Sequence, residues 1–372
     1  MPFSKRSEWP AECSPLASAI AEAGALVDLT AANPTQVGFA YGETALSVLL
    51  DGAGDYAPHA TGLRSAREAV VRYYGEHGAA CEPEHVVIAA STSELYAHVL
   101  ALLCDPGDTV LVPQPSYPLL PYIADLMSVK LAPYPLHYDG AWHPELPNVW
   151  PQGARALVSV SPNNPTGNYL KSDELRAIAR VCPALIVDEV FNDFPLEPQP
   201  QQVLTTVGRA ECLTFTLSGL SKVGLLPQLK LAWCVVSGPA PMRDEALARL
   251  ELIADTFLST AAPVQRALPQ LLELSAHMRQ RVRARMALNL VALDELLAGT
   301  PLSRLMVEGG WSVIVRLPAT RDDAEWALHF VREARVVVQP GYFYDLPFCA
   351  CVLSLLTPPS QFRTRIDETH FT

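Results

Sequence analysis

Seven short apolar segments, separated by helix-like stretches, dominate the middle of the chain and restrict the folds that it can adopt. They cover residues 85–90, 109–113, 129–134, 154–161, 184–188, 212–217 and 229–236. These segments are rich in Val, Ile and Leu and do not alternate with polar residues, which is typical of strands covered on both faces of a largely parallel sheet. Helical patterns lie before and between them, at 65–78, 93–103 and 172–182. This repetition of strand and helix predicts a doubly wound α/β domain.

A second, smaller domain is expected because 372 residues are too many for one ordinary core. The pattern at 262–297 is helical and arginine-rich, and it predicts a long connecting helix. Beyond it lie a strand-like segment at 309–317, a helix-like segment at 322–334 and a further strand at 351–356. We therefore predict an N-terminal arm (1–45) that contributes to the small domain, a large domain (46–262), and a connecting helix with the small C-terminal domain (263–372).

The composition excludes several kinds of partner. The formal net charge of −12 argues against nucleic acid or an anionic membrane as the main partner. The N-terminus lacks the apolar stretch of a secretory signal and no 18-residue apolar run occurs, so a cytoplasmic location is expected. The eight cysteines are scattered without a C-x-x-C pair, which favours buried thiols and predicts no metal site.

Lys222 lies just beyond the apolar strand that ends at Leu217, in the sequence SGLSK. A setting of Gly, Ser, Leu and Val lowers the pKa of an amine by desolvation and favours Schiff-base chemistry. The alternative is an ordinary surface lysine that follows a strand.

Two further polar residues follow apolar strands, and ligands of open α/β sheets bind at such strand ends. Asp188 ends the strand 184–188, where a carboxylate can bind a protonated pyridine nitrogen; the alternative is a helix N-cap. Asn164, in SPNNPTG, follows the strand 154–161 and can donate an amide hydrogen bond to a ring hydroxyl. Its alternative is a generic turn.

Hydroxyl-bearing residues join the strand 85–90 to the next helix. Ser91, Thr92 and Ser93 are placed to bind a phosphate at the helix N-terminus, while Ser91 and Glu94 also fit a capping box, and both can hold at once. Tyr117, in PQPSYPLL, can stack on a planar ring or pack in the core.

Taken together, six short segments in this order resemble the class I/II aminotransferases of pyridoxal 5′-phosphate (PLP) fold type I. The resemblance runs from about residue 29 to 362 and rests on Tyr56 with Gly62, Ser91–Ser93, Pro115–Tyr117, Asn164–Gly167, Asp188–Phe191 and Ser221–Lys222. It implies a large domain with a mostly parallel seven-stranded sheet between helices, plus a smaller α/β C-terminal domain.

The resemblance also implies roles for individual residues. Lys222 is similar to the lysine that holds PLP as a Schiff base and moves protons during the reaction. Asp188 corresponds to the partner of the pyridine nitrogen, Asn164 to the donor to the phenolic oxygen, and Tyr117 to the ring-stacking aromatic residue. Tyr56 corresponds to a tyrosine lent to the phosphate of a neighbouring subunit, which implies a homodimer with shared active sites. The implied phosphate ligands are Ser91, Thr92, Ser93, Ser221 and Lys230.

The cofactor site departs from the family pattern at three positions. Phe191 stands where many members have a tyrosine that bonds the phenolic oxygen. Lys230 replaces an arginine, giving a point charge instead of a fork. Gly219 replaces a phosphate-binding serine, and the adjacent Ser218 is expected to compensate.

The substrate site departs as well. Val352 occupies the place of an arginine that clamps the substrate carboxylate in many members. We take Arg316 as the candidate substitute, with a solvent-facing charge at a strand end as the alternative. Asn33 is the other candidate substrate-binding residue.

The expected function is amino transfer between an amino donor and a 2-oxo acid, with PLP as cofactor. A PLP-dependent C–S lyase or decarboxylase and a non-catalytic PLP-binding homologue remain as alternatives. They remain open because the orientation of the bonds over the cofactor ring decides which bond breaks.

Overall fold

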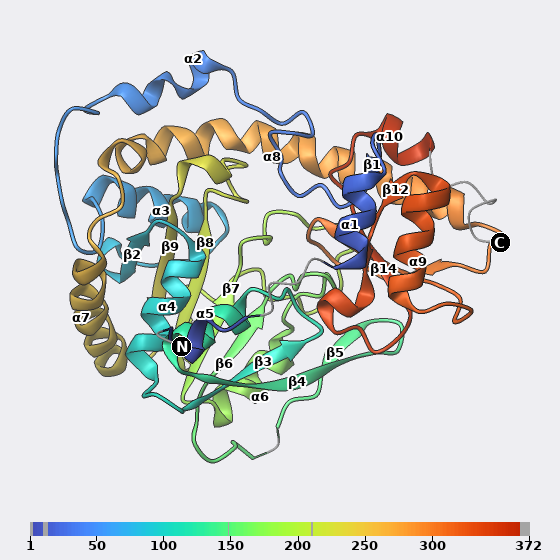
Figure 1. The fold of residues 1–372 in the computed structure, drawn as a ribbon. Coiled ribbons are helices and arrows are strands. Elements are labelled where there is room, and N and C mark those ends of the chain that lie inside the picture. Colours follow the sequence, from blue (N-terminus) through green and yellow to red (C-terminus); the bar gives the residue numbers. More distant parts are fainter. Residues whose placement is uncertain (1–2, 10–13, 148, 210, 365–372) are drawn as a thin grey trace.

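An eight-stranded sheet forms the centre of the larger part of the molecule, in a computed structural model that describes residues 3–9, 14–147, 149–209 and 211–364 (Figure 1). Its spatial order is β2, β9, β8, β7, β6, β3, β4, β5. The bounds are β2 Val86–Ala89, β3 Thr109–Gln114, β4 Lys130–Tyr138, β5 Trp142–Pro144, β6 Ala154–Val160, β7 Ala184–Asp188, β8 Leu213–Gly219 and β9 Ala232–Ser237. All seven predicted strands are present. The eighth strand, β5, has only three residues and pairs antiparallel with β4 at the edge of the sheet. No apolar pattern in the sequence predicts it.

The strand directions bring the predicted site residues to one edge of the sheet. Strands β4, β3, β6, β7 and β8 run parallel to one another, whereas β9 is antiparallel to both β8 and β2. Two antiparallel steps restore the direction, so β2 runs the same way as β8. The carboxyl ends of β2, β3, β6, β7 and β8 therefore meet at the same edge.

Helices cover both faces of this sheet. Helices α4 (Thr92–Leu103), α5 (Leu120–Met127) and α7 (Ala240–Phe257) pack on one face. Helices α3 (Arg64–Glu76) and α6 (Ser172–Val181) and the first half of α8 (Ala262–Leu297) pack on the other. The predicted helices at 65–78, 93–103 and 172–182 are confirmed, with ends within two residues.

The 36-residue helix α8 joins the two parts of the molecule (Figure 1). At 1.5 Å per residue it is about 54 Å long. Its first half packs against α3 and the large sheet, and its second half packs in the core of the smaller part. Although α8 and α7 are long, none of the helices in the described ranges is long and apolar enough to cross a membrane.

The smaller part is built from both ends of the chain. A four-stranded sheet has the order β10 (Ser303–Arg304), β11 (Ser312–Arg316), β14 (Ala350–Ser354), β13 (Gln339–Pro340). Helix α9 (Asp323–His329) continues as a π-helical turn at Phe330–Ala334, and α10 (Pro359–Thr364) follows β14. The remaining short elements are α2 (Glu43–Leu46) and 3₁₀ turns at Lys5–Ser7, Ser47–Leu50, Pro83–His85, Pro227–Leu229 and Gly341–Tyr344.

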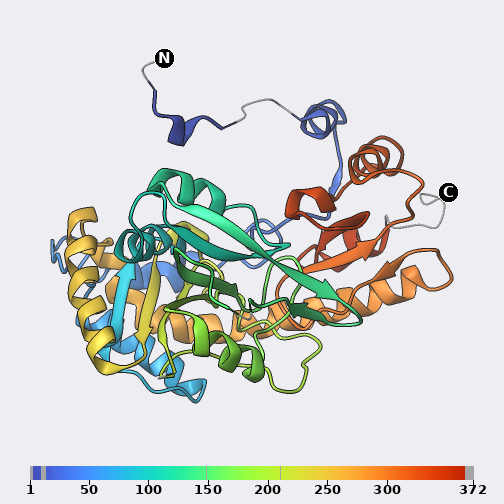
Figure 2. The ribbon, with the colours of Figure 1, turned by 90° about the horizontal axis from the view of Figure 1, so that it is seen from below.

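The N-terminal segment lies beside this smaller part. Strand β1 (Val27–Asp28) pairs in parallel with β12 (Val336–Val337), and α1 (Pro15–Glu22) lies next to α9 (Figure 2). The N-terminal chain therefore packs against elements more than 300 residues away. The domain boundaries at residues 45 and 262 stay a prediction.

Candidate active site

Five loops bring the predicted site residues to the carboxyl edge of the large sheet. Each candidate lies at or just beyond the end of a strand: Ser91–Ser93 after β2, Tyr117 after β3, Asn164 after β6, Asp188 at the end of β7, and Lys222 after β8. Residues that are far apart in the sequence thus share one region, as expected for the ligand site of an open α/β sheet.

Lys222 is enclosed by aromatic rings rather than exposed on the surface. Its Nζ atom lies 4.6 Å from the centroid of the Trp311 ring and 5.3 Å from that of Phe191. Burial removes water from the amine and lowers the pKa of Lys222 to about 8, while the charge of Asp188 opposes this shift. A pKa of about 8 leaves a usable fraction of neutral, nucleophilic amine near neutral pH. Lys222 is partly buried, which disfavours the alternative of an ordinary exposed lysine, and its role in cofactor binding stays a prediction.

Asp188 is held by two hydrogen bonds, one to each carboxylate oxygen. The backbone N–H of Val190 donates to Oδ1 at 3.1 Å, and the hydroxyl of Tyr96 donates to Oδ2 at 3.2 Å. Desolvation raises the pKa of Asp188 to about 6, and these two donors and Lys222 oppose that rise. No helix begins at Asp188, since a turn follows β7, so the N-cap alternative is wrong.

The N-terminus of α4 combines capping with free hydroxyls. Ser91 is the N-cap, and its Oγ accepts from the backbone N–H of Glu94 at 3.1 Å. The Glu94 carboxylate accepts from the N–H of Ala90 at 2.6 Å instead of closing the box on Ser91. Thr92 and Ser93 occupy the first turn and are partly exposed. The capping prediction is confirmed for Ser91, and the phosphate-binding role of the three residues stays a prediction.

The Asn164 loop contacts the smaller part of the molecule. The Ser312 hydroxyl donates to Asn164 Oδ1 at 3.3 Å, which leaves the Asn164 amide N–H groups as donors. Gly167 has a φ of +74°, and a Cβ there would lie 2.4 Å from Val307 Cγ2, so only glycine fits. The backbone N–H of Gly309 donates to the Gly167 carbonyl at 2.9 Å. This docking brings the start of β11, with Trp311, to Lys222.

The other candidates are found at or near the molecular surface. Tyr117 is 52% exposed, with its ring 6.5 Å from that of Tyr344, so it is not a core residue. Tyr56 is 88% exposed. Lys230 is exposed, Ser221 is partly buried, and Asn33 lies in a turn where its Oδ1 accepts from the N–H and hydroxyl of Thr35. The roles of these residues stay predictions.

The expectation that Ser218 replaces the phosphate-binding serine missing at position 219 is wrong. Leu217 packs in the core on the α4 side of the sheet, whereas Thr216 points to the other side and contacts Thr206 at 2.8 Å. Side chains alternate along a strand, so Ser218 also points away from α4, and its Oγ is buried without a partner in the described structure. At Gly219 a Cβ would lie 2.9 Å from both Cα and Cβ of Ala232, which explains why no serine stands there.

The expected role of Arg316 in carboxylate binding is also wrong. Arg316 is exposed and stacks on Phe348, with its guanidinium carbon 4.3 Å from the ring centroid. It lies four residues beyond Ser312, which is about 13 Å along a strand. The solvent-facing alternative describes it correctly. Val352 is 1% exposed and pairs with Ile314 and Gln339, so apolar packing fills this position.

The sequence reasoning missed two residues of this site, Trp311 and Tyr96. Trp311 is buried, follows Gly309-Gly310 and makes edge-to-face contacts with Phe191 and Phe194. Tyr96 contacts Asp188 from α4. A signal existed for Tyr96, because it is four residues after Thr92 and so lies on the same face of the helix. For Trp311 the only signal was a large aromatic residue at the start of a strand.

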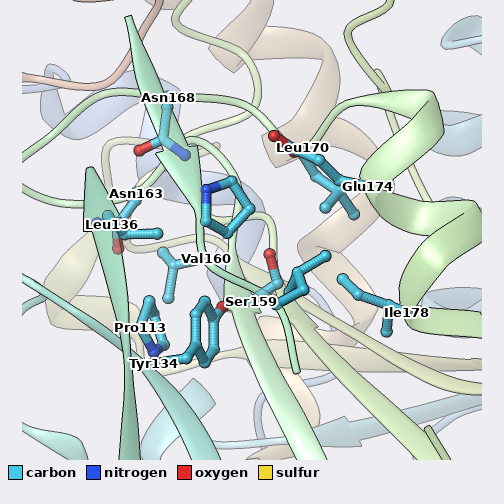
Figure 3. Close-up of a pocket in the computed structure, with 12 residues that line it drawn as sticks. Pro113, Tyr134, Leu136, Ser159, Val160, Asn163, Asn168, Leu170, Glu174 and Ile178 are labelled. Carbon is cyan, nitrogen blue, oxygen red and sulfur yellow. The ribbon is translucent and has the colours of Figure 1, made fainter. Parts of the chain in front are cut away.

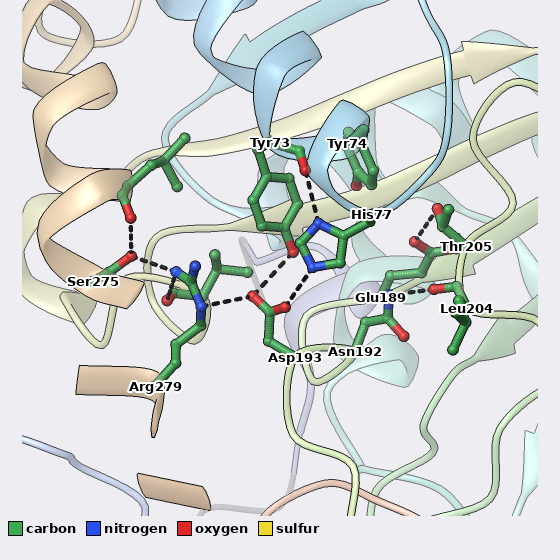
Figure 4. A network of polar contacts seen from close by, with 12 residues as sticks. Tyr73, Tyr74, His77, Glu189, Asn192, Asp193, Leu204, Thr205, Ser275 and Arg279 are labelled. Atoms are coloured by element: carbon green, nitrogen blue, oxygen red, sulfur yellow. Dashed lines mark hydrogen bonds and ion pairs between the residues drawn. The ribbon is translucent and has the colours of Figure 1, made fainter. Parts of the chain in front are cut away.

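Buried polar contacts fix the loop that follows Asp188 (Figure 4). Glu189 accepts hydrogen bonds from Thr205 and Thr206, and burial raises its pKa to about 7. Further along, Asp193 contacts Tyr73 at 3.1 Å, His77 at 2.8 Å and Arg279 at 3.2 Å. Arg279 also donates to the carbonyl of Val223, so α8 links the Asp188 loop to the Lys222 loop.

A small cavity lies away from these residues, between the sheet and α6 (Figure 3). Ser159, Asn163, Asn168 and Glu174 provide its polar lining. Its volume of about 10 Å³ is at the lower limit for one water molecule. None of the predicted site residues lines it, so it is not a candidate substrate site.

The residues at the carboxyl edge fit the chemistry of PLP. The partly desolvated amine of Lys222 is suited to react with the aldehyde of PLP. The partly buried carboxylate of Asp188 has unused lone pairs that can accept the pyridinium N–H. The amide of Asn164 can donate to the phenolic oxygen, and the N-terminus of the 12-residue helix α4 can bind the phosphate. Each of these residues is only partly buried, although the strands before them are buried.

Comparisons with known proteins agree with this arrangement. The family model of class I and II aminotransferases matches residues 49–364. The glutamate-pyruvate aminotransferase AlaA of Haemophilus influenzae is 29% identical over 258 residues, which cover 66% of this chain and 63% of that protein. The match thus spans less than two thirds of the curated relative.

Solved structures share the fold. An alanine aminotransferase from Pyrococcus furiosus has a TM-score of 0.83 at 19% identity, covering 99% of both chains. An aspartate aminotransferase double mutant from Thermus thermophilus has 0.83 at 21%, covering 100% of this chain and 99% of that one. Because the family model covers most of its length, the chain belongs to the class I and II aminotransferase family, whose cofactor is PLP.

Proposed function

We propose that the chain is a PLP-dependent aminotransferase that moves an amino group between an amino donor and a 2-oxo acid. The observation that carries this proposal is the pairing of a desolvated amine, Lys222, with an electrostatically coupled carboxylate, Asp188, at the carboxyl edge of the sheet. The relatives named glutamate-pyruvate and tyrosine aminotransferase favour amino transfer over elimination or decarboxylation.

Bound PLP supplies an electron sink for the bonds at the substrate α-carbon. The residues of this chain hold it and move protons. Asp188 would accept the pyridine N–H, the Asn164 amide would donate to the phenolic oxygen, and the N-terminus of α4 would bind the phosphate. The Lys222 amine, with its pKa lowered to about 8, takes a proton and returns it near neutral pH. Trp311 and Phe191 exclude water from that amine.

Single-turnover absorbance measurements with a panel of amino compounds test this proposal. Amino transfer converts the cofactor to its pyridoxamine form and releases a 2-oxo acid or an aldehyde. Accumulation of pyruvate and ammonia from cysteine-type substrates would identify a lyase instead, and carbon dioxide would identify a decarboxylase. A protein that binds PLP and turns nothing over would contradict any catalytic function.

The proposal includes a homodimer with shared sites. Tyr56 is 88% exposed, so its ring is available to a second subunit. If it completes the partner's phosphate site, mixing the inactive variants Tyr56→Ala and Lys222→Ala should restore activity to about a quarter of wild type in a closed two-fold dimer. A monomer in light scattering, or no recovery on mixing, would contradict this arrangement.

A further inference from the structure

Tyr96 lies in the second turn of α4, beneath the predicted phosphate site. It is four residues after Thr92, so both side chains project from the same face of the helix. Its ring is 6% exposed and packs among apolar side chains, including Val158 and Ile186. Packing therefore holds the phenol in place, and its hydroxyl donates to Asp188 Oδ2 at 3.2 Å.

The Asp188 carboxylate has few other partners that stabilise its charge. Val190 N–H donates to Oδ1, and within the described residues no lysine or arginine forms an ion pair with Asp188. The charged and titratable groups that act on this region are Lys222 from the loop after β8, Glu189 beside it, and Tyr134, which helps to raise the pKa of Tyr96. Tyr96 is thus the one side chain that hydrogen-bonds to Asp188 in the described structure.

We propose that Tyr96 is a positioning residue of the cofactor site, which holds Asp188 ionised and oriented as the acceptor for the pyridine nitrogen. The inference rests on the proposed function. It makes α4 serve both ends of the cofactor: the first turn binds the phosphate, and the second turn supports the partner of the ring nitrogen. Because the Tyr96 ring is buried, the pKa of its hydroxyl is raised, and it stays a donor at every working pH.

Binding of pyridoxine 5′-phosphate to the apo-protein tests the inference without catalysis. This probe has the ring nitrogen and the phosphate but no aldehyde, so it forms no bond with Lys222. Tyr96→Phe should weaken its affinity about tenfold at pH 6.5, because Asp188 without this donor takes up a proton more readily. At pH 9 Asp188 is ionised in both proteins, and the difference should fall below about threefold.

Two further variants separate positioning from structural damage. Tyr134→Phe removes another buried hydroxyl, which bonds to the Val158 carbonyl at 2.8 Å, and should change affinity equally little at both pH values. The Asp188→Asn variant should itself bind the probe weakly. Adding Tyr96→Phe to this variant should cause no further pH-dependent loss of affinity. A Tyr96→Phe defect that is absent, or equal at pH 6.5 and pH 9, would overturn the inference. If Asp188→Asn binds the probe like wild type, the proposed cofactor site itself is wrong.

Discussion

The Nζ atom of Lys222 lies 4.6 Å from the centroid of the Trp311 ring, although 89 positions separate the two residues along the chain. Lys222 belongs to the large sheet's edge, while Trp311 immediately precedes β11 of the smaller sheet. The aromatic ring helps to remove water from the amine, and desolvation lowers the pKa of Lys222 more than the charge of Asp188 raises it. The reactive amine therefore depends on both parts of the molecule.

The pH dependence of cofactor capture should follow the lowered pKa of Lys222. An amine attacks the PLP aldehyde only when it is neutral, so the capture rate should rise with pH with a midpoint near 8 instead of the usual value above 10. Stopped-flow absorbance of apo-protein mixed with PLP measures this rate. Lys222→Ala should give no borohydride-reducible PLP adduct, whereas the exposed Lys130→Ala should behave like wild type. A midpoint near 10 would contradict the enclosed site.

Phe191→Tyr should move the pH titration of the cofactor's visible band to lower pH. Phe191 is buried, and its ring centroid is 5.3 Å from Lys222 Nζ, so a hydroxyl added there is close to the amine that we propose to bind the cofactor. A donor to a charged oxygen is worth about 1.5–3 kcal/mol, which corresponds to about one or two pH units. Phe191→Leu removes the ring without adding a donor and serves as control. If both variants titrate like wild type, Phe191 does not lie at the phenolic oxygen.

Amino donors without an α-carboxylate should be preferred over the corresponding amino acids. Val352 is buried beside Ile314, and Arg316 is exposed on Phe348, so neither residue offers a cation to a carboxylate. A desolvated carboxylate without a partner costs several kcal/mol. Comparing kcat/KM for amino acids and their decarboxylated amines measures the preference. Arg316→Ala should change these values less than about twofold. Efficient use of common amino acids, lost in Arg316→Ala, would refute this prediction.

Asp193→Ala should lower the free energy of unfolding by about 3–5 kcal/mol, because it leaves the Arg279 charge buried without its partner. Asp244→Ala breaks an exposed ion pair with Arg243 and should cost less than about 1 kcal/mol. Denaturant unfolding followed by fluorescence compares the two variants. Equal losses would mean that the network around Asp193 contributes no more than a surface pair.

The stability contributed by His77 should depend on pH. Its hydrogen bond to Asp193 raises the pKa of His77, so this contribution is complete below the ordinary value near 6.5 and is lost as pH rises through the raised pKa. Melting temperatures between pH 6 and pH 9 should therefore fall more for wild type than for His77→Gln. Parallel curves for the two proteins would exclude a charged His77 in the folded state.

Several features could be predicted from the sequence because they are encoded locally. The seven apolar runs specify strands buried on both faces, and the long helix at 262–297 has its predicted ends. The order of strand ends then places Asn164, Asp188 and Lys222 at one edge of the sheet, since parallel strands all point the same way. The short strand β5 cannot be predicted from the sequence, because its three residues are too few to show a hydrophobic pattern and form a strand only by pairing with β4.

Other features were decided by tertiary packing. The position of Ser218 in SGLSK predicts a role in the phosphate site, but strand alternation turns its side chain away from α4. The charge of Arg316 makes it a candidate for binding the substrate carboxylate, but its place at the far end of β11 exposes it to solvent. In each case the residue type is suitable, but the direction of the Ser218 side chain and the position of Arg316 along its strand are not.

The sequence by itself determined which strands and helices form and which reactive residues end the strands, because short-range periodicity and residue type suffice for both. Only the tertiary structure decided what surrounds those residues. Trp311 reaches Lys222 because Gly167 and Gly309 let the Asn164 loop dock against the start of β11. Tyr96 reaches Asp188 because α4 packs across β8 and β9, next to the end of β7. The contacts that adjust the pKa values of Lys222 and Asp188 depend on the packing of distant segments, which no local pattern encodes.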